Sequence, residues 1–140
     1  MSRFLLFFAF LFPFVGYFGG YLHHYQCGKC ATVVKSEYSP STYGCPAGGS
    51  HQWHKLGKVG DKNYMCHKCG TLVECDSYPS TYGCPASGSH QWHQLGKVGN
   101  DVFQCRKCGV IVNNERTPST YGCPRAAPTS GTNSPANLDQ

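Results

Sequence analysis

The sequence of 140 residues contains little charge, because Asp, Glu, Lys and Arg together make up 14% of it, roughly half the share typical of soluble domains. No stretch after Leu22 shows the apolar period of an amphipathic helix. Phenylalanine is also scarce in most of the chain: seven of the eight Phe lie between Phe4 and Phe18, and only Phe103 lies beyond. These absences argue against a helical bundle and against a mid-sized enzyme with one large core.

Catalytic arrangements are missing as well. The sequence has no Ser/His/Asp set with a recognisable nucleophile elbow, no phosphate-binding glycine loop and no carboxylate pair. Its CxxC pairs lack the βαβ setting of thiol–disulfide oxidoreductases. We therefore expect a protein that is not an enzyme. The formal charge of +5 includes no Lys/Arg run longer than two residues, so nucleic-acid binding is a minor alternative.

The N-terminal segment Phe4–Leu22 is uncharged over 19 positions and follows Arg3. Nineteen helical residues span about 28 Å, close to a hydrocarbon core of roughly 30 Å. A cleaved signal peptide is the alternative. Cleavage after Gly16, Gly19 or Gly20 would place Phe14, Tyr17 or Phe18 at the third position before the cleaved bond, where a small residue is needed. We favour an uncleaved membrane-inserted helix, which predicts a single-pass membrane protein. Cleavage of the segment would instead give a secreted protein. Positive charges do not fix the side of the membrane.

The rest of the chain is built from a 39-residue repeat. Residues 25–63 and 64–102 match at 25 of 39 positions without a gap, and a third copy begins at Phe103 and stops matching after Pro124. We therefore divide the chain into a signal anchor or signal peptide at 1–22, repeats at 23–63 and 64–102, a truncated repeat at 103–124 and a polar tail at 125–140. The composition of the tail predicts disorder.

Each repeat is expected to form short strands. The β-branched segments Ala31–Val34, Thr71–Glu74 and Val110–Val112 follow the three CxxC pairs. The stretches 52–59 and 91–98 alternate in part, and the pairs Gly60-Asp61 and Gly99-Asn100 supply turn residues. The sequence therefore predicts a small β fold of three tandem hairpin modules, with hairpin turns at these two glycine pairs.

The cysteines explain how such small units fold. A 39-residue unit buries too little apolar surface to fold alone and needs a metal or a disulfide. The first two repeats share the pattern Cys-x2-Cys-x14-Cys-x5-His, which supplies four ligands for a tetrahedral zinc ion. The candidate ligands are Cys27, Cys30, Cys45 and His51, then Cys66, Cys69, Cys84 and His90, and finally Cys105, Cys108 and Cys123.

These motifs resemble the zinc-ribbon and rubredoxin-like group, in which two Cys-containing β-turns clamp one metal. We call the turn that contains each CxxC pair a knuckle. In the second and third repeats the knuckle reads CHKCG or CRKCG, with a glycine after the second cysteine, whereas the first repeat has Ala31 in place of that glycine. The second Cys-containing turn departs from that group, which usually carries CPxCG, because this sequence reads CPAGGSH and CPASGSH. The resemblance therefore implies tandem metal-stapled β modules, with a histidine ligand that favours zinc over iron.

Three points stay open from the sequence. His54 or His93 could replace His51 or His90 as the ligand. In a second register, each histidine would serve the CxxC pair of the next repeat, and His23 or His24 would complete the first site. Disulfides could replace metal if the chain is exported, although the three recurring cysteines of a repeat cannot all pair with one another.

The smaller features allow three further expectations. Cys75 lies outside the pattern and is either a free thiol or an intermolecular bridge. Trp53 and Trp92 are expected in the core of each unit. The recurring tyrosines of the PSTYGC runs, Tyr43, Tyr82 and Tyr121, are expected to cover the metal sites or to pack on the adjacent repeat.

The favoured function is a membrane-anchored or exported repeat protein whose zinc-stapled modules bind a protein partner or self-associate, because near-identical repeats offer the same surface several times. One alternative is an exported, disulfide-rich structural protein of an extracellular assembly. The other is a nucleic-acid-binding zinc-ribbon protein.

Overall fold

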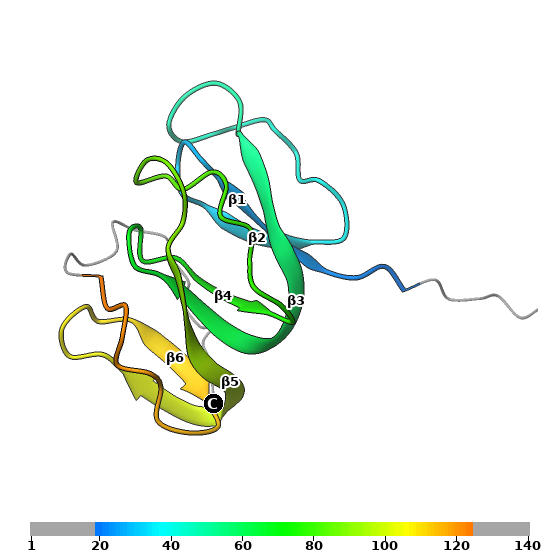
Figure 1. The fold of residues 1–140 in the computed structure, drawn as a ribbon. Coiled ribbons are helices and arrows are strands. Elements are labelled where there is room, and N and C mark those ends of the chain that lie inside the picture. The colour runs from blue at the N-terminus through cyan, green and yellow to red at the C-terminus, as the bar shows by residue number, and fades with distance from the viewer. Residues whose placement is uncertain (1–18, 125–140) are drawn as a thin grey trace, which may run out of the picture.

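The computed structural model of this chain describes residues 19–124, which form a small all-β fold around one curled, six-stranded sheet (Figure 1). The strands are β1 His23–Cys27, β2 Val33–Ser36, β3 Trp53–Cys66, β4 Leu72–Cys75, β5 Trp92–Gln104 and β6 Ile111–Asn114. All pairings are antiparallel, in the order β2-β1-β3-β5-β6, with β4 paired to β3. The expected small β fold is confirmed.

The two long strands join one repeat to the next. The first part of β3 pairs with β1, from Trp53 to Lys58, whereas its second part pairs with β4 and β5. In the same way, β5 pairs first with β3 and then with β6. The CxxC hairpin of each of the first two repeats therefore gains a third strand, residues 53–58 or 92–97. We call this strand together with the two residues before it, 51–58 or 90–97, the closing strand of the module. The closing strand runs straight on into the first strand of the next module.

The predicted hairpin turns at Gly60-Asp61 and Gly99-Asn100 are wrong, because both glycines lie inside β3 and β5. A Cβ atom at Gly60 would collide with the backbone of Asp76, and one at Gly99 with the backbone of Glu115. The glycines are thus required for the close approach of two chain segments at a β-bulge. The repeat boundaries after Asn63 and Val102 accordingly fall inside continuous strands.

Adjacent modules also contact one another through buried polar side chains. Gln26 donates a hydrogen bond to the Thr71 hydroxyl at 2.6 Å, and His24 Nε2 lies 2.9 Å from the carbonyl oxygen of Glu74. Asn63, the counterpart of His24, donates to the Asn113 carbonyl at 2.7 Å. These contacts join the three modules into one folded unit.

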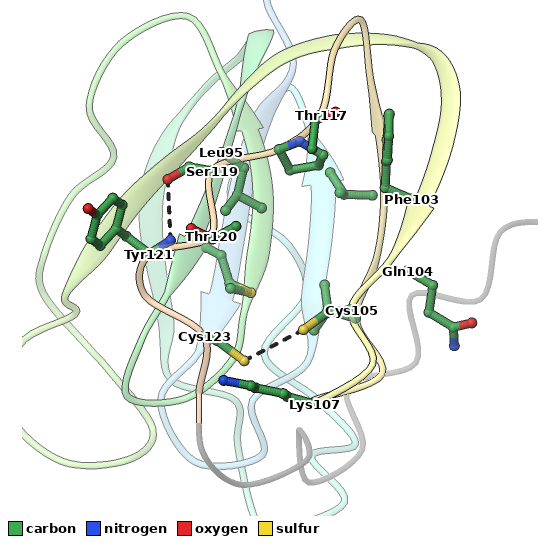
Figure 2. A pocket seen from close by; sticks show the side chains of 14 residues that line it. Leu95, Phe103, Gln104, Cys105, Lys107, Thr117, Ser119, Thr120, Tyr121 and Cys123 are labelled. Carbon is green, nitrogen blue, oxygen red and sulfur yellow. Dashed lines mark hydrogen bonds between the residues drawn. The ribbon is translucent and has the colours of Figure 1, made fainter.

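The third module has no closing strand within the described residues. Its hairpin of β5 and β6 leaves an open cavity of about 390 Å³ (Figure 2). We call this cavity the third-module groove. Its walls include Leu95, Phe103, Cys105, Val112, Ser119 and Cys123.

The predicted N-terminal helix over Phe4–Leu22 lies mostly outside the described residues. Residues 19–22, the part of this segment that the structure describes, are not helical. The Leu22 carbonyl accepts a hydrogen bond from the Val59 amide at 2.9 Å, and the Lys58 ammonium lies 3.5 Å from the centre of the Tyr21 ring. Residues 19–124 include no helix long and apolar enough to cross a membrane.

Candidate metal centres

Each CxxC pair lies on a tight turn that closes the hairpin of its module. The amide of the residue after the second cysteine donates to the carbonyl of the first: Gly70 to Cys66 at 2.8 Å and Ala31 to Cys27 at 2.9 Å. The donor residue has a positive φ of 63° at Ala31 and 74° at Gly70. This conformation suits glycine and is strained for alanine. The loss of the knuckle glycine in the first repeat therefore leaves the turn intact but less favourable.

The third cysteine of each module lies on the PSTYGCP loop. The glycine before it has φ between 76° and 79° in all three modules, so the recurring glycine has a conformational cause. The loop is joined to the closing strand by the amide of the predicted ligand histidine. His51 donates to the Thr42 carbonyl at 2.6 Å, and His90 donates to that of Thr81 at 2.7 Å.

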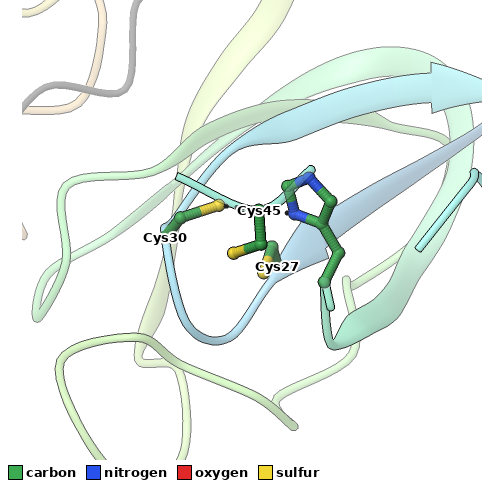
Figure 3. A group of neighbouring side chains, drawn as sticks. Cys27, Cys30 and Cys45 are labelled. Atoms are coloured by element: carbon green, nitrogen blue, oxygen red, sulfur yellow. Dashed lines mark hydrogen bonds between the residues drawn. The ribbon is translucent and has the colours of Figure 1, made fainter. Parts of the chain in front are cut away.

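The structure brings together the predicted ligands of each repeat. Cys27, Cys30, Cys45 and His51 form one group, Cys66, Cys69, Cys84 and His90 a second, and Cys105, Cys108 and Cys123 a third. The ligand atoms within each group all lie within 4.8 Å of one another. The three sulfur ligands of the first group face one another in Figure 3. Each group could hold a metal ion.

The spacing of these atoms fits a tetrahedral ion. Metal–sulfur and metal–nitrogen bonds of about 2.3 and 2.0 Å place sulfur atoms about 3.8 Å apart, and a sulfur and a nitrogen about 3.5 Å apart. The distance from Cys30 Sγ to His51 Nδ1 is 3.5 Å, that from Cys69 Sγ to His90 Nδ1 is 3.6 Å, and that from Cys105 Sγ to Cys123 Sγ is 3.7 Å. Nδ1 is therefore the histidine atom that faces the sulfur ligands.

Hydrogen bonds around each CxxC turn lower the pKa of the first cysteine of the pair. A hydrogen bond from the Cys69 thiol, aided by His90, lowers the pKa of Cys66 to about 3. Backbone amides of Cys108 and Lys107 lower the pKa of Cys105 to about 7. Burial raises the pKa of Cys84, as expected for a thiol that keeps its proton until a metal displaces it. Metal affinity should therefore fall as the pH falls.

The tryptophan of each closing strand supports the ligand histidine. The His90 and Trp92 rings stack with their centres 4.6 Å apart, and those of His51 and Trp53 at 4.5 Å. Trp92 is 5% exposed and packs with Leu56 and Tyr64 in a buried cluster, as expected, while Trp53 is only partly buried. The Trp92 indole donates to the Ser80 carbonyl at 2.9 Å. The stacking and this hydrogen bond fix the closing strand against the loop.

The second histidine of each His-x2-His pair lies away from the clusters. His54 packs against Gly83, and His93 packs against Gly122, so each ring contacts the PSTYGCP loop of the next module. A side chain at either glycine would collide with the ring. Sequence reasoning missed this inter-module contact, although the joint recurrence of the histidine and the loop glycine was the available signal.

The structure does not bring together the ligands of the alternative register. His51 faces Cys30 rather than the second CxxC pair, and His24 bonds the Glu74 carbonyl instead of joining the first cluster. The third cluster consequently has three cysteine ligands and no histidine among the described residues. Cys105 and Cys123 are also less buried than Cys66 and Cys84, their counterparts in the second module.

The structure also decides two further expectations: it bears out the free-thiol alternative for Cys75 and overturns the expected placement of the loop tyrosines. Cys75 is a free thiol with no exposed surface, packed in the same buried cluster as Trp92, so it cannot reach another chain. The three tyrosines of the PSTYGC runs neither cover the metal ligands nor pack on a neighbouring module. They are 86%, 77% and 78% exposed at Tyr43, Tyr82 and Tyr121. All ten cysteines, which fall within residues 19–124, are free thiols in the structure.

Comparison with known proteins adds no relative, since the chain matches no protein-family model, no curated protein and no solved structure.

We expect His90→Ala to weaken metal binding at the second module by on the order of 100-fold or more, because losing a ligand costs more than losing a residue that supports one. The matched variant His93→Ala leaves all four ligand atoms in place and should retain the metal. Metal content under competition with a chelator, measured for the purified variants, distinguishes the two. Equal losses from both variants would contradict the assignment of His90 Nδ1 as the ligand.

Proposed function

We propose that this chain is a non-enzymatic repeat protein whose modules are stapled by zinc and present a repeated tyrosine surface to a protein partner. The four-ligand groups of the first two modules support zinc, because three thiolates and one imidazole at tetrahedral spacing form a closed structural site. Such a site leaves no coordination position for a substrate. The interpretation of the sequence as tandem zinc-ribbon-like modules rests on these same two groups.

The observation that supports partner binding most directly is the repeated exposure of one tyrosine per module. Tyr43, Tyr82 and Tyr121 occupy equivalent positions and are at least 77% exposed. The backbone amide of each bonds the hydroxyl of the serine two residues earlier, at 3.3 to 3.4 Å, so the loop that presents the ring is held in a defined turn. Tyrosine is enriched in protein interfaces, where one ring supplies a large contact area at little entropic cost.

The apolar segment before residue 19 supports a site of action at a membrane or outside it. Residues 19–22 are not helical, and the Leu22 carbonyl is hydrogen-bonded to Val59 of β3, so we place the end of the inserted segment at about residue 18. The apolar segment 4–18 is short for a helix that spans a membrane. Its length suits the apolar region of a signal sequence or a short membrane anchor. We propose delivery to a membrane as the role of this segment.

Metal content distinguishes the zinc-stapled protein from its disulfide-bonded alternative. Purified with a thiol reductant and again without one, the chain should hold at least two zinc ions, one for each four-ligand group, and chelation should release the thiols and unfold it. The measurement pairs elemental analysis with thiol counting in denaturant. A chain that contains neither metal nor free thiols would be the disulfide-bonded protein, and the zinc proposal would then be wrong.

Replacing Tyr43, Tyr82 and Tyr121 together by serine should abolish capture of the partner while leaving zinc content and thermal stability unchanged, because these rings make little contact with the fold. The control variant carries Tyr38→Ser, at a position that is also 77% exposed but does not recur in the repeats. The two are compared by cross-linking and mass spectrometry in an extract of the source cells. An identical set of cross-linked proteins for both variants would sink the tyrosine-surface proposal.

Residues 1–18 should be required for delivery to the membrane. The full chain is expected in the membrane fraction or in the medium, and a chain that begins at Gly19 in the soluble fraction of the cell, because the described part lacks an apolar helix. Fractionation with alkaline extraction separates these locations. A full chain that stays soluble inside the cell would contradict the proposed delivery.

A further inference from the structure

The third-module groove corresponds in position to the place where Trp92 is packed in the second module. In the second module, Trp92 packs in a cluster with Leu56, Tyr64, Cys66, Val73 and Cys84. Their counterparts one repeat later are Leu95, Phe103, Cys105, Val112 and Cys123, and all five line the groove. No tryptophan stands at that position of the third repeat, where the counterpart of Trp92 is Gly131. Apart from Cys75, whose counterpart is Asn114, the buried residues around Trp92 thus recur as walls of the groove, and the tryptophan that would fill it is missing.

The backbone positions around the groove are also those that a closing strand uses elsewhere. In the second module, Cys66 is paired with Trp92 in the β ladder, His67 donates to the Gln91 carbonyl at 2.8 Å, and the Thr81 carbonyl accepts from His90. The counterparts of the three receiving residues are Cys105, Arg106 and Thr120. Within the described residues, the last part of β5 pairs only with β6, so its other edge, which ends at Gln104 beside Cys105, is free to pair with another strand.

The third cluster lacks the same element. Its three sulfur ligands are the two cysteines of the knuckle and the one cysteine of the loop. The knuckle and the loop supply the equivalent three ligands in the other two modules. The missing fourth ligand is the one that the closing strand carries, since His51 and His90 both belong to that strand. A single strand with the pattern His-x-Trp would therefore supply the ligand, the core side chain and the ladder pairing together.

Copies of this chain cannot supply such a strand without losing one. Each chain has three CxxC hairpins but only two closing strands among its described residues, 51–58 and 90–97. If one copy lent a closing strand to the third module of another copy, it would leave one of its own modules open. The sequence that follows the third module, residues 125–140, contains no histidine, cysteine or aromatic residue. Within this sequence, the His-x-Trp pattern occurs only in the two closing strands already in use, and this favours a segment of a different protein as the occupant.

We propose that the third module is an acceptor for an extended segment of a partner protein that carries a histidine and, two residues later, a tryptophan. The segment adds as an antiparallel strand to the free edge of β5, its indole fills the third-module groove and donates to the Ser119 carbonyl, and its imidazole completes the third metal site. This mode is strand addition with side-chain pockets for specificity. It rests on the proposed zinc-stapled modules, and it gives the partner a chemistry that the tyrosine surface does not specify.

The test uses the zinc-loaded full chain and a peptide with the sequence of residues 86–98, ASGSHQWHQLGKV, as the probe. Titration calorimetry should show one peptide bound per chain, and elemental analysis after desalting should show zinc rising from two to three ions per chain. Peptides with Trp92→Ala or His90→Ala should bind more weakly by on the order of tenfold or more, because each removes a buried anchor. The peptide with His93→Ala, whose histidine is not a ligand in the second module, is the matched control and should bind.

A second protein checks that the groove itself is competent. In this variant residues 125–137 are replaced by the sequence of residues 86–98, so that the third module carries its own closing strand. It should hold three zinc ions and no longer bind the peptide. The proposal is overturned if the full chain fails to bind the peptide at about 1 mM while this variant folds with three zinc ions, or if all four peptides bind equally. If the full chain contained no zinc in its first two modules, the proposed function itself would be wrong. Zinc content therefore distinguishes a failure of the proposed function from a failure of the acceptor proposal.

Discussion

The fold depends on the tie between each CxxC hairpin and the closing strand that follows it. The described core is small, and cysteines are a large part of it: the main buried cluster contains Cys66, Cys75 and Cys84 beside a handful of apolar side chains. Apolar burial on this scale is not enough for a stable unit, so the ligand atoms must be held together by something stronger than packing. A metal ion at the centre of each four-ligand group would join knuckle, loop and closing strand at one point.

Strand continuity turns this local tie into a property of the whole array. Because the closing strand of one module becomes the first strand of the next, a module cannot lose its tie without disturbing the edge on which its neighbour pairs. The contacts between modules differ in chemistry, however. Gln26 meets Thr71 through a hydrogen bond at the first junction, whereas Met65, the counterpart of Gln26, lies in an apolar cluster with Leu95 and Val112 at the second. Each junction is matched on both sides, so the modules are similar without being interchangeable.

The sequence was most informative where a chemical requirement repeats with a fixed period. The cysteine spacing predicted which thiols meet, because knuckle and loop geometry is local and recurs three times. The sequence could not choose between His51 and His54, since that choice depends on how the strand is placed against the loop. It also misjudged Gly60, because a glycine needed for close approach of Asp76 has the same signature as a glycine in a turn. The tyrosines of the loops were misplaced for a related reason: aromatic recurrence does not show whether a ring faces inward or outward.

The two ends of the array differ physically, and this difference gives it a direction. A Cβ atom at Gly44 of the first module would meet nothing within 4 Å, whereas Gly83 and Gly122 are each covered by a histidine from the module before. The last module has the opposite character, since its apolar walls, free strand edge and three sulfur ligands are all formed but not covered by any described residue. Repeat arrays usually end in units with a polar outer face that close the stack. A half-module whose apolar walls no described residue covers is suited to being completed by a strand of a partner, and because that strand would add antiparallel to β5, completion would hold the partner in a single orientation relative to the loop tyrosines.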